Sequence, residues 1–265
     1  MKTRIGSEIR GYGSLVDAAL HGKVALVTGG ARRVGAAIVR RLHARGAAVL
    51  VHYRSSAADA RSLAAELNQR RPGSAAVAAC DLLQVAELPR LVDAAVGSFG
   101  RLDVLVNNAS SFYPTPMGEI GERAWDDLVG TNFKAPVFLA QAAAPELSRN
   151  EGCIVNIADI HAEHPMKNHL VYSAAKAGLV AATRALAREL APRVRVNAVA
   201  LGPILWPEDS PWSDEAMRAR VVERTLLRRV GDPDDVAKAV AYLVADAPYV
   251  TAQVLNVDGG RTIAL

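Results

Sequence analysis

The sequence predicts an α/β protein built on a single doubly wound, Rossmann-type parallel sheet of seven strands. From Lys23 onward, short apolar runs rich in Val and Ile alternate with longer stretches of helical period, which is typical of repeated βα units. Turn and cap signals agree with this pattern, as where Asp232 and Pro233 begin the last long helical stretch. No linker interrupts the alternation. We therefore expect one domain, residues 23–265, after a flexible N-terminal extension, residues 1–22.

Seven apolar runs have the length and composition of buried strands. Right-handed crossovers between parallel strands bring all the carboxyl ends to one edge of the sheet, where such sheets bind ligands. The predicted strands are 24–28, 48–53, 75–80, 103–108, 153–157, 194–199 and 253–257.

The composition excludes several classes of protein. The chain has 265 residues, of which 51% are hydrophobic, and its net charge of +4 comes from scattered basic residues rather than from a nucleic-acid-binding stripe. Cys80 and Cys153 lack metal or disulfide spacing, and no apolar run approaches the length of a membrane span. His161 and His164 lack a third ligand, so no metal site is expected. We expect a cytoplasmic protein that binds neither nucleic acid nor a membrane.

A glycine-rich turn follows the first predicted strand. The stretch TGGARRVGAAI, residues 28–38, leads into a helix, so its N–H groups and the helix dipole can hold a pyrophosphate. The spacing of Gly29, Gly30 and Gly35 differs from GxGxxG. Taken alone, the pattern also fits an ordinary strand-to-helix turn.

The end of the second strand indicates which dinucleotide is bound. NAD sites usually have an Asp or Glu here for the ribose 2′-hydroxyl, whereas a 2′-phosphate requires cations. The stretch VHYRSS contains no carboxylate, and Arg54 and Ser55 can bind a phosphate, with Arg32 as a second cation. We therefore expect NADPH; the alternative is that Arg54 is a solvated loop charge. Asp81, after the third strand, either accepts from the adenine amine or caps the next helix.

Tyr172 and Lys176 are spaced i and i+4 on a helix expected to begin near Leu170, so they share a face. A phenol with a pKa of about 10 is a poor acid–base group at neutral pH unless a cation stabilises its anion. Lys176 can supply that cation and also bind the nicotinamide ribose.

Several motifs in order resemble the short-chain dehydrogenase/reductase family over nearly the whole chain from Lys23. They are TGxxxRxG, NNAS, the Asn of GTNFKAP, YSAAK and the terminal VDGG. Arg33 stands where the family has its middle glycine. The family typically places a Ser before the Tyr, where it polarises a substrate carbonyl, but this chain has Asp159, thirteen residues before Tyr172.

An aspartate at this position changes the expected substrate. An ionised carboxylate would repel a developing alkoxide, so Asp159 suits a substrate with N–H groups better than a simple ketone. It can relay a proton to nitrogen as hydride arrives at carbon. The alternative is that Asp159 only orders the following loop, and that Ser110 or a water replaces the missing hydroxyl.

The pteridine reductase subgroup resembles this arrangement, because it has Asp, Tyr and Lys together with an Arg in the first turn. VHYRSSAADA and NNASSFYPTP also match. The resemblance implies NADPH-dependent reduction of pterins or dihydropterins, and possible activity on dihydrofolate, by a homotetramer. Phe112 would stack on one face of the pterin, opposite the nicotinamide. Asn132 would hold a helix kink that connects Lys176 to solvent.

The expected site residues fall into three groups. The catalytic residues are Asp159, Tyr172, Lys176 and Asn132. The cofactor-binding residues are Gly29, Arg32, Arg33, Val34, Tyr53, Arg54, Ser55, Asp81, Leu82, Asn108, Ala109, Lys176, Gly202 and Ile204. The substrate-binding residues are Arg33, Ser110, Phe112, Asp159, Tyr172 and Trp206.

Two regions depart from the subgroup or leave alternatives open. The stretch 201–212 has no second glycine after the sixth strand and is expected to form a substrate lid, in which Trp206 and Trp212 line the pocket or only pack the lid down. Arg261 is expected to reach the site of a neighbouring subunit. The rival functions are a reductase of another carbonyl or imine, and a nucleotide-responsive binding protein without activity.

Overall fold

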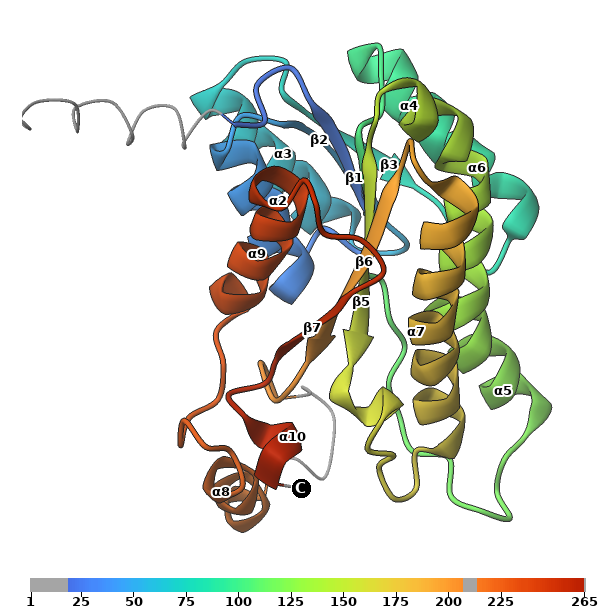
Figure 1. Ribbon diagram of the computed structural model, residues 1–265, viewed down its shortest axis with the longest axis vertical. Coiled ribbons are helices and arrows are strands. Elements are labelled where there is room, and N and C mark those ends of the chain that lie inside the picture. Colours follow the sequence, from blue (N-terminus) through green and yellow to red (C-terminus); the bar gives the residue numbers. More distant parts are fainter. Residues whose placement is uncertain (1–18, 207–213, 265) are drawn as a thin grey trace, which may run out of the picture.

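A seven-stranded sheet in the order β3-β2-β1-β4-β5-β6-β7 forms the centre of the molecule, and every neighbouring pair of strands is parallel (Figure 1). The computed structural model describes residues 19–206 and 214–264. The predicted fold class is therefore confirmed. The strands are β1 (Val24–Val27), β2 (Ala48–Tyr53), β3 (Ala75–Ala79), β4 (Val104–Asn107), β5 (Cys153–Asp159), β6 (Arg195–Leu201) and β7 (Val254–Val257).

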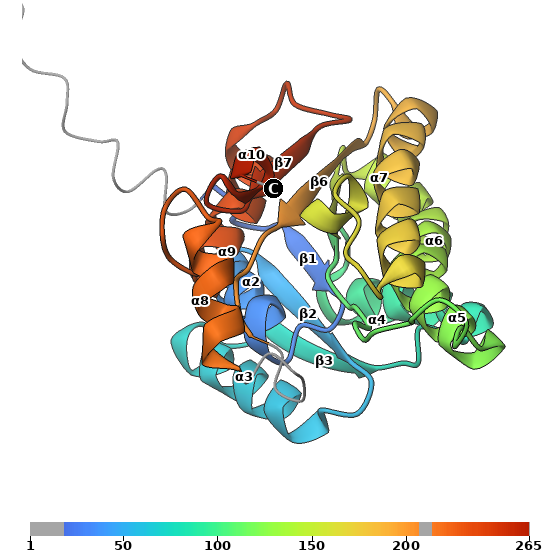
Figure 2. The same cartoon turned by 90° about the horizontal axis from the view of Figure 1, so that it is seen from below.

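Helices cover both faces of the sheet (Figure 1). One face carries α2 (Arg33–Ala44), α3 (Ala57–Arg70) and α9 (Pro233–Ala241). The other carries α4 (Pro89–Phe99), α6 (Ala135–Arg149) and α7 (Leu170–Leu190). Helix α5 (Glu122–Val129) joins α6 through a π-helical turn, Gly130–Lys134. The short helices α8 (Glu215–Glu223) and α10 (Arg261–Ala264) lie below the sheet in Figure 1, and Figure 2 views the molecule from that side.

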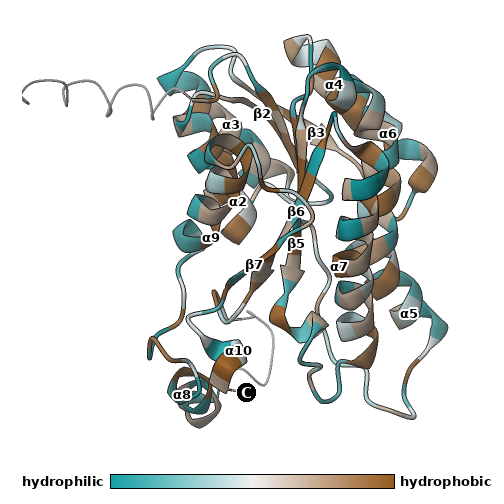
Figure 3. Cartoon of the chain, in the orientation of Figure 1, coloured by the Kyte–Doolittle hydropathy of each residue, from teal (hydrophilic) through white to brown (hydrophobic). Residues whose placement is uncertain are grey.

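The alternation of side chains along the strands divides the core into two halves. On β1, Ala25 and Val27 pack in the cluster that includes α2 and α9, whereas Val24 and Leu26 pack in the cluster that includes α4 and α6. Because both faces are covered, the strands are mostly apolar, whereas the helices carry both apolar and polar residues (Figure 3). The predicted start of α9 is also confirmed. Asp232 is its N-cap and forms a capping box with Asp235, and Pro233 is the first residue of the helix.

Two strands are longer than the sequence pattern predicts. β5 and β6 stay paired for two residues beyond their expected ends, up to the register pair of Asp159 and Leu201. Asp159 is therefore the last residue of β5, at the carboxyl edge of the sheet.

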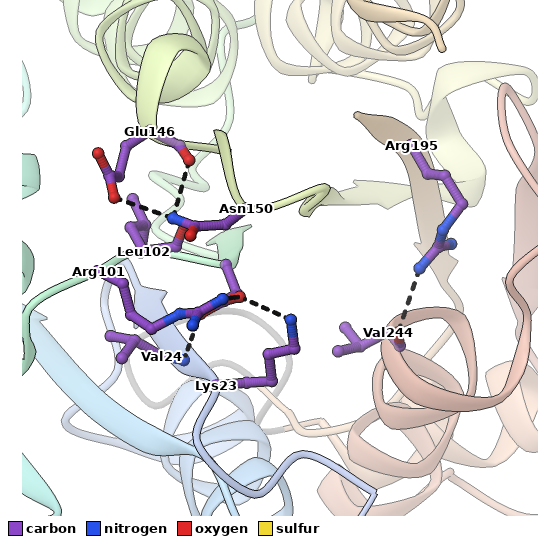
Figure 4. A network of polar contacts seen from close by, with 9 residues as sticks. Lys23, Val24, Arg101, Leu102, Glu146, Asn150, Arg195 and Val244 are labelled. Atoms are coloured by element: carbon purple, nitrogen blue, oxygen red, sulfur yellow. Dashed lines mark hydrogen bonds and ion pairs between the residues drawn. The ribbon is translucent and has the colours of Figure 1, made fainter. Parts of the chain in front are cut away.

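A charged cluster lies at the opposite, amino edge (Figure 4). The carboxylate of Asp103 accepts hydrogen bonds from Lys23 Nζ at 3.0 Å, from Arg101 at 2.7 and 2.8 Å, and from the N–H of Val24 at 2.9 Å. These bonds join the start of β1 to the residue before β4, and they lie far from the ligand-binding edge.

The chain joins the fold before Lys23. Leu20 is buried in the core, and its N–H donates to the carbonyl oxygen of Arg45 at 2.9 Å. The expected boundary after residue 22 is therefore too late, and residues 1–18 of the expected extension lie outside the described residues. Within the part of the chain that is described, no helix combines the length and apolarity needed to cross a membrane.

Candidate active site

Two adjoining cavities open at the carboxyl edge of the sheet. The first, of about 400 Å³, lies over the glycine-rich turn and the ends of β2 to β5. The second, of about 520 Å³, lies between the loop after β4 and the segment after β6. The residues that both cavities share are Arg33, Val34, Ser110, Asp159, Tyr172 and Leu201.

The glycine-rich turn packs closely against the end of β4 and against the start of α2, and two of its glycines have no room for a side chain. Gly29 has a φ of 58°, and a Cβ there would lie 3.0 Å from Cα of Ala109. A Cβ on Gly35 would lie 2.2 Å from the carbonyl oxygen of Gly29. Arg33 has a φ of 52°, so it adopts the backbone conformation expected of the glycine that it replaces. That conformation costs a non-glycine residue about 1 kcal/mol, and it directs Arg33 to the junction of the cavities.

Thr28 and Asn108 hold the turn against the end of β4. Thr28 Oγ1 accepts from the N–H groups of Asn108 and Ala109 at 2.9 and 3.0 Å. Asn108 Nδ2 donates to the carbonyl oxygens of Thr28 and Gly29 at 2.9 and 3.1 Å. The expected cofactor residue Asn108 therefore lines the cavity while its amide shapes the turn.

The two cations expected near a 2′-phosphate have different surroundings. Arg54 lines the first cavity with Ser55, and within the described residues it has no hydrogen-bond or ion-pair partner. Arg32 is already paired with Asp59, at 2.6 Å. Arg54 is therefore the more available cation.

The remaining cofactor residues divide between the two cavities. Asp81 lines the first cavity and accepts from the N–H of Leu83 at 3.1 Å; this closes a turn before the next helix, which has Gln84 as its N-cap. Gly202 and Ile204 line the second cavity and not the first. The expected residues that line the first are Gly29, Arg32, Arg33, Val34, Tyr53, Arg54, Ser55, Asp81, Leu82, Asn108, Ala109 and Lys176.

Tyr172 and Asp159 form a direct hydrogen bond. The Tyr172 hydroxyl donates to Asp159 Oδ2 at 2.8 Å, and the tyrosine is 4% exposed. Asp159 Oδ1 also accepts from the N–H of His161 at 2.8 Å, so it orders the following loop as well. Asp159 can therefore order the loop after β5 and also lie beside Tyr172 in the cavity.

Lys176 is buried one turn of α7 beyond Tyr172. Its Nζ donates to the carbonyl oxygen of Ile157 at 2.8 Å and lies 5.7 Å from the centre of the Tyr172 ring. Burial lowers the pKa of Lys176 to about 8, against the opposing effect of Asp159. Burial and the charge of Asp159 raise the pKa of Tyr172 well above its usual value, which is opposite to the shift expected from Lys176 alone. Tyr172 is therefore a neutral hydrogen-bond donor.

Asn132 lies in the π-helical turn between α5 and α6, where a kink is expected. It is fully buried, and its Nδ2 donates to the carbonyl oxygens of Ser111 and Leu128, both at 2.9 Å. Its Oδ1 accepts from Ser110 Oγ at 2.6 Å. The Ser110 hydroxyl also opposes the upward pKa shift of Tyr172, and the two residues line both cavities.

Aromatic rings define the second cavity. Phe112 lines it, stacks on His169 at 4.8 Å between ring centres, and meets the edge of Tyr172 at the same distance. Trp206 also lines it, and the carbonyl oxygen of Trp206 accepts from Arg33 at 3.0 Å. Trp212 lies outside the described residues.

Arg261 lies near the expected substrate site. It lines this chain's own second cavity, and its expected reach into a neighbouring subunit stays a prediction. Its Nη1 donates to the carbonyl oxygen of Val221 on α8 at 2.9 Å. The contact between α8 and α10 places it there.

Two further residues that the sequence analysis missed are His52 and His169. Each contacts neighbours that are distant in sequence, so no local motif reveals these contacts. Thr28 belongs to the TGxxxRxG motif, but its hydrogen bonds to Asn108 and Ala109 appear only in the structure. Among the described residues, no group of three or more His, Cys, Asp or Glu side chains is arranged to hold a metal.

The fold and site define a reductase of the Rossmann class with a nicotinamide cofactor, and comparisons with known proteins agree. The model of a family described as Enoyl-(Acyl carrier protein) reductase matches residues 29–262. Pteridine reductase 1 of Leishmania tarentolae is 39% identical over 91% of this chain and 96% of its own length. The putative ketoacyl reductase 2 of the granaticin polyketide synthase of Streptomyces violaceoruber is 39% identical over 89% and 95%. The 3-oxoacyl-acyl-carrier-protein reductase FabG of Staphylococcus aureus is 35% identical over 90% and 97%. The chain belongs to the short-chain dehydrogenase/reductase family.

Proposed function

We propose that this chain is an NADPH-dependent reductase of pterins or dihydropterins, with possible activity on dihydrofolate. The observation that carries the proposal is the hydrogen bond of 2.8 Å between the Tyr172 hydroxyl and Asp159. It places a carboxylate where a substrate N–H group can be bound, beside a phenol that retains its proton. The similarity to pteridine reductase 1 supports the same substrate class.

Asp159 and Tyr172 supply the proton chemistry in this proposal. A bound NADPH supplies the hydride. Asp159 accepts a hydrogen bond from an N–H group of the substrate, which orients the heterocycle. Tyr172 then delivers its hydroxyl proton to the ring nitrogen, and Lys176 stabilises the phenolate that remains.

The second cavity supplies a place for a flat ring. Phe112 is held in orientation by its stacking on His169 and by its edge contact with Tyr172. A planar substrate can lie in this cavity beside Phe112, with Ser110 and Arg33 at its polar edge. Trp206 completes the lining.

The phosphate end of the first cavity supports NADPH over NADH. Arg54 and Ser55 offer a guanidinium and a hydroxyl, and Arg54 has no partner among the described residues. A carboxylate at the same place would instead bind the ribose hydroxyls. The cavity at the glycine turn would hold the pyrophosphate at the start of α2, where the helix dipole favours an anion.

A second candidate function is reduction of a carbonyl. The observation that favours it is the Ser110 hydroxyl, which lines both cavities together with Tyr172. It could polarise a carbonyl oxygen in place of the missing serine if its hydrogen turned from Asn132 Oδ1 to the substrate. Two of the relatives are named as ketoacyl or 3-oxoacyl reductases.

A substrate panel separates the two candidates. NADPH oxidation is measured with biopterin, dihydrobiopterin and dihydrofolate, and in parallel with ketones and 3-oxoacyl thioesters. We expect turnover of the pterins, and we expect Asp159→Ser to lower kcat/KM for them by about 10- to 100-fold, the usual size of a hydrogen bond to a charged group. Tyr172→Phe is the control for loss of the proton donor. Rapid ketone reduction without detectable pterin turnover would replace the first candidate by the second.

The proposed enzyme is a cytoplasmic homotetramer. Its apolar surface supports self-association, because Trp125 on α5 and Phe138 on α6 are 47% and 38% exposed. Both belong to the same helical layer.

A further inference from the structure

His52 connects two parts of the first cavity that come from different strands. It lies on β2 and is 1% exposed. Its Nδ1 lies 3.0 Å from the N–H of Gly29 in the turn after β1, and its Nε2 lies 3.0 Å from the carbonyl oxygen of Cys80 after β3. An amide N–H only donates and a carbonyl only accepts, so the ring is neutral and carries its proton on Nε2.

The backbone of His52 binds the next amide of the same turn. Its carbonyl oxygen accepts from the N–H of Gly30 at 2.9 Å. Two successive N–H groups of the glycine-rich turn are therefore bound by one residue of β2 and are unavailable to a ligand. The orientation of the turn depends on where His52 holds these two groups.

The other end of the imidazole acts on the opposite wall of the cavity. Cys80 immediately precedes Asp81, which lines the cavity near the end of β3. The Nε2–H bond to Cys80 therefore holds the backbone from which Asp81 projects. The glycine turn and the Asp81 segment are far apart in sequence, and His52 is hydrogen-bonded to both.

We propose that His52 is a positioning residue for the dinucleotide: its neutral imidazole holds the glycine-rich turn and the end of β3 at the separation that binds the cofactor. The inference deepens the proposed function and rests on the nicotinamide cofactor of the family. His52 lines the cavity, but its ring nitrogens are occupied by the protein.

Protonation of His52 would break this arrangement, because Nδ1 of an imidazolium carries a hydrogen and cannot accept from Gly29. Burial lowers the pKa of His52 from its usual 6.5, and this effect exceeds the opposing effects of the Cys80 carbonyl and of the charge on Asp81. The contacts from the turn after β1 are backbone groups only. The bridge is therefore intact at neutral pH and is lost in acid.

Three substitutions distinguish the effects of the two hydrogen bonds that the imidazole of His52 makes. His52→Asn keeps an acceptor for Gly29 but loses the donor to Cys80, His52→Gln keeps a donor toward Cys80, and His52→Leu loses both. The dissociation constants of NADPH and NADH are measured by fluorescence titration at pH 8, with melting temperatures as the control for folding. We expect His52→Leu to weaken cofactor binding by about 10-fold or more, with Asn and Gln variants between it and wild type.

A pH series gives a readout that a purely structural role would not change. Because the pKa of His52 lies below 6.5, the series extends from pH 8 to pH 4.5, and at its acid end we expect cofactor binding to weaken more in wild type than in His52→Asn, which has no titrating ring. The 2′-phosphate of NADPH has a pKa of about 6, so NADH serves as the ligand without that group. Equal pH dependence in the two proteins, or unchanged affinity in a His52→Leu variant with a lowered melting temperature, would overturn the inference. Binding of NADH without binding of NADPH would contradict the proposed cofactor preference and not the role of His52. The comparison of wild type with His52→Leu would then be decided by the dissociation constants for NADH.

Discussion

Asp159 shows how one side chain can have two roles that appear exclusive in the sequence. One carboxylate oxygen orders the loop after β5, and the other accepts from the Tyr172 hydroxyl. A serine hydroxyl at this position would donate to a carbonyl, whereas a carboxylate accepts from N–H groups. Under the proposed function, an aspartate in place of the serine would therefore change which substrates Tyr172 can serve.

Arg54 gives a residue-scale prediction about the cofactor. Arg54→Ala removes a charge-assisted contact to the 2′-phosphate, and we expect the KM for NADPH to rise about 10- to 100-fold with little change for NADH. Initial rates with each cofactor measure this selectivity.

Arg32→Ala is the matched control for Arg54. Arg32 is already paired with Asp59 on an exposed surface, so its removal should change the NADPH preference by less than about threefold. If Arg32→Ala raised the KM for NADPH more than Arg54→Ala did, Arg32 and not Arg54 would be the main contact of the 2′-phosphate.

At the scale of elements, α2 is joined to the segment before β3 by a buried histidine. His43 Nε2 lies 2.7 Å from Ser74 Oγ, and Ser74 in turn donates to the carbonyl oxygen of Arg71 at 2.5 Å. Ser74 therefore accepts from a neutral His43. Burial, with the charges of Arg71 and Arg70, lowers the pKa of His43 from 6.5 to about 4.

The lowered pKa of His43 predicts a pH-dependent stability. Because the unfolded chain binds a proton at a higher pH than the folded chain does, the stabilisation is complete above pH 6.5 and declines as the pH falls toward 4. Urea unfolding at fixed protein concentration should show a smaller loss between pH 7 and pH 4.5 in His43→Gln than in wild type. His164→Gln, at an exposed position, is the matched control. Parallel losses in wild type and His43→Gln would exclude His43 as the source.

At the scale of the whole molecule, the exposed aromatic residues on α5 and α6 predict self-association. Each chain has a mass of 28.1 kDa, and we expect wild type to sediment at four times that mass. A variant with Trp125→Glu and Phe138→Glu should sediment as a dimer, because a tetramer with two kinds of interface loses one of them. Sedimentation velocity measures both, and circular dichroism checks the fold. Wild type sedimenting as a single chain would exclude the tetramer.

Much of the fold and part of the site could be predicted because their signals are local. The apolar runs and the cap at Asp232 predicted the strands and α9, and the spacing of Tyr172 and Lys176 placed both on one helix. The place of Arg261 in this chain's own second cavity had no local signal, because it depends on the contact of α10 with α8. His52 gave no sequence signal, because its partners lie 23 and 28 residues away on different segments.

The sequence by itself determined the alternation of strands and helices, and with it the edge at which Asp159, Tyr172 and Lys176 would meet. Periodicity and turn chemistry act over a few residues, so they can be read along the chain. Only the tertiary structure decided which groups are paired: Arg32 with Asp59, Tyr172 with Asp159, and His52 with Gly29 and Cys80. The pKa shifts of Tyr172 and Lys176 were decided there too, because desolvation depends on everything that packs around a group and not on its neighbours in sequence.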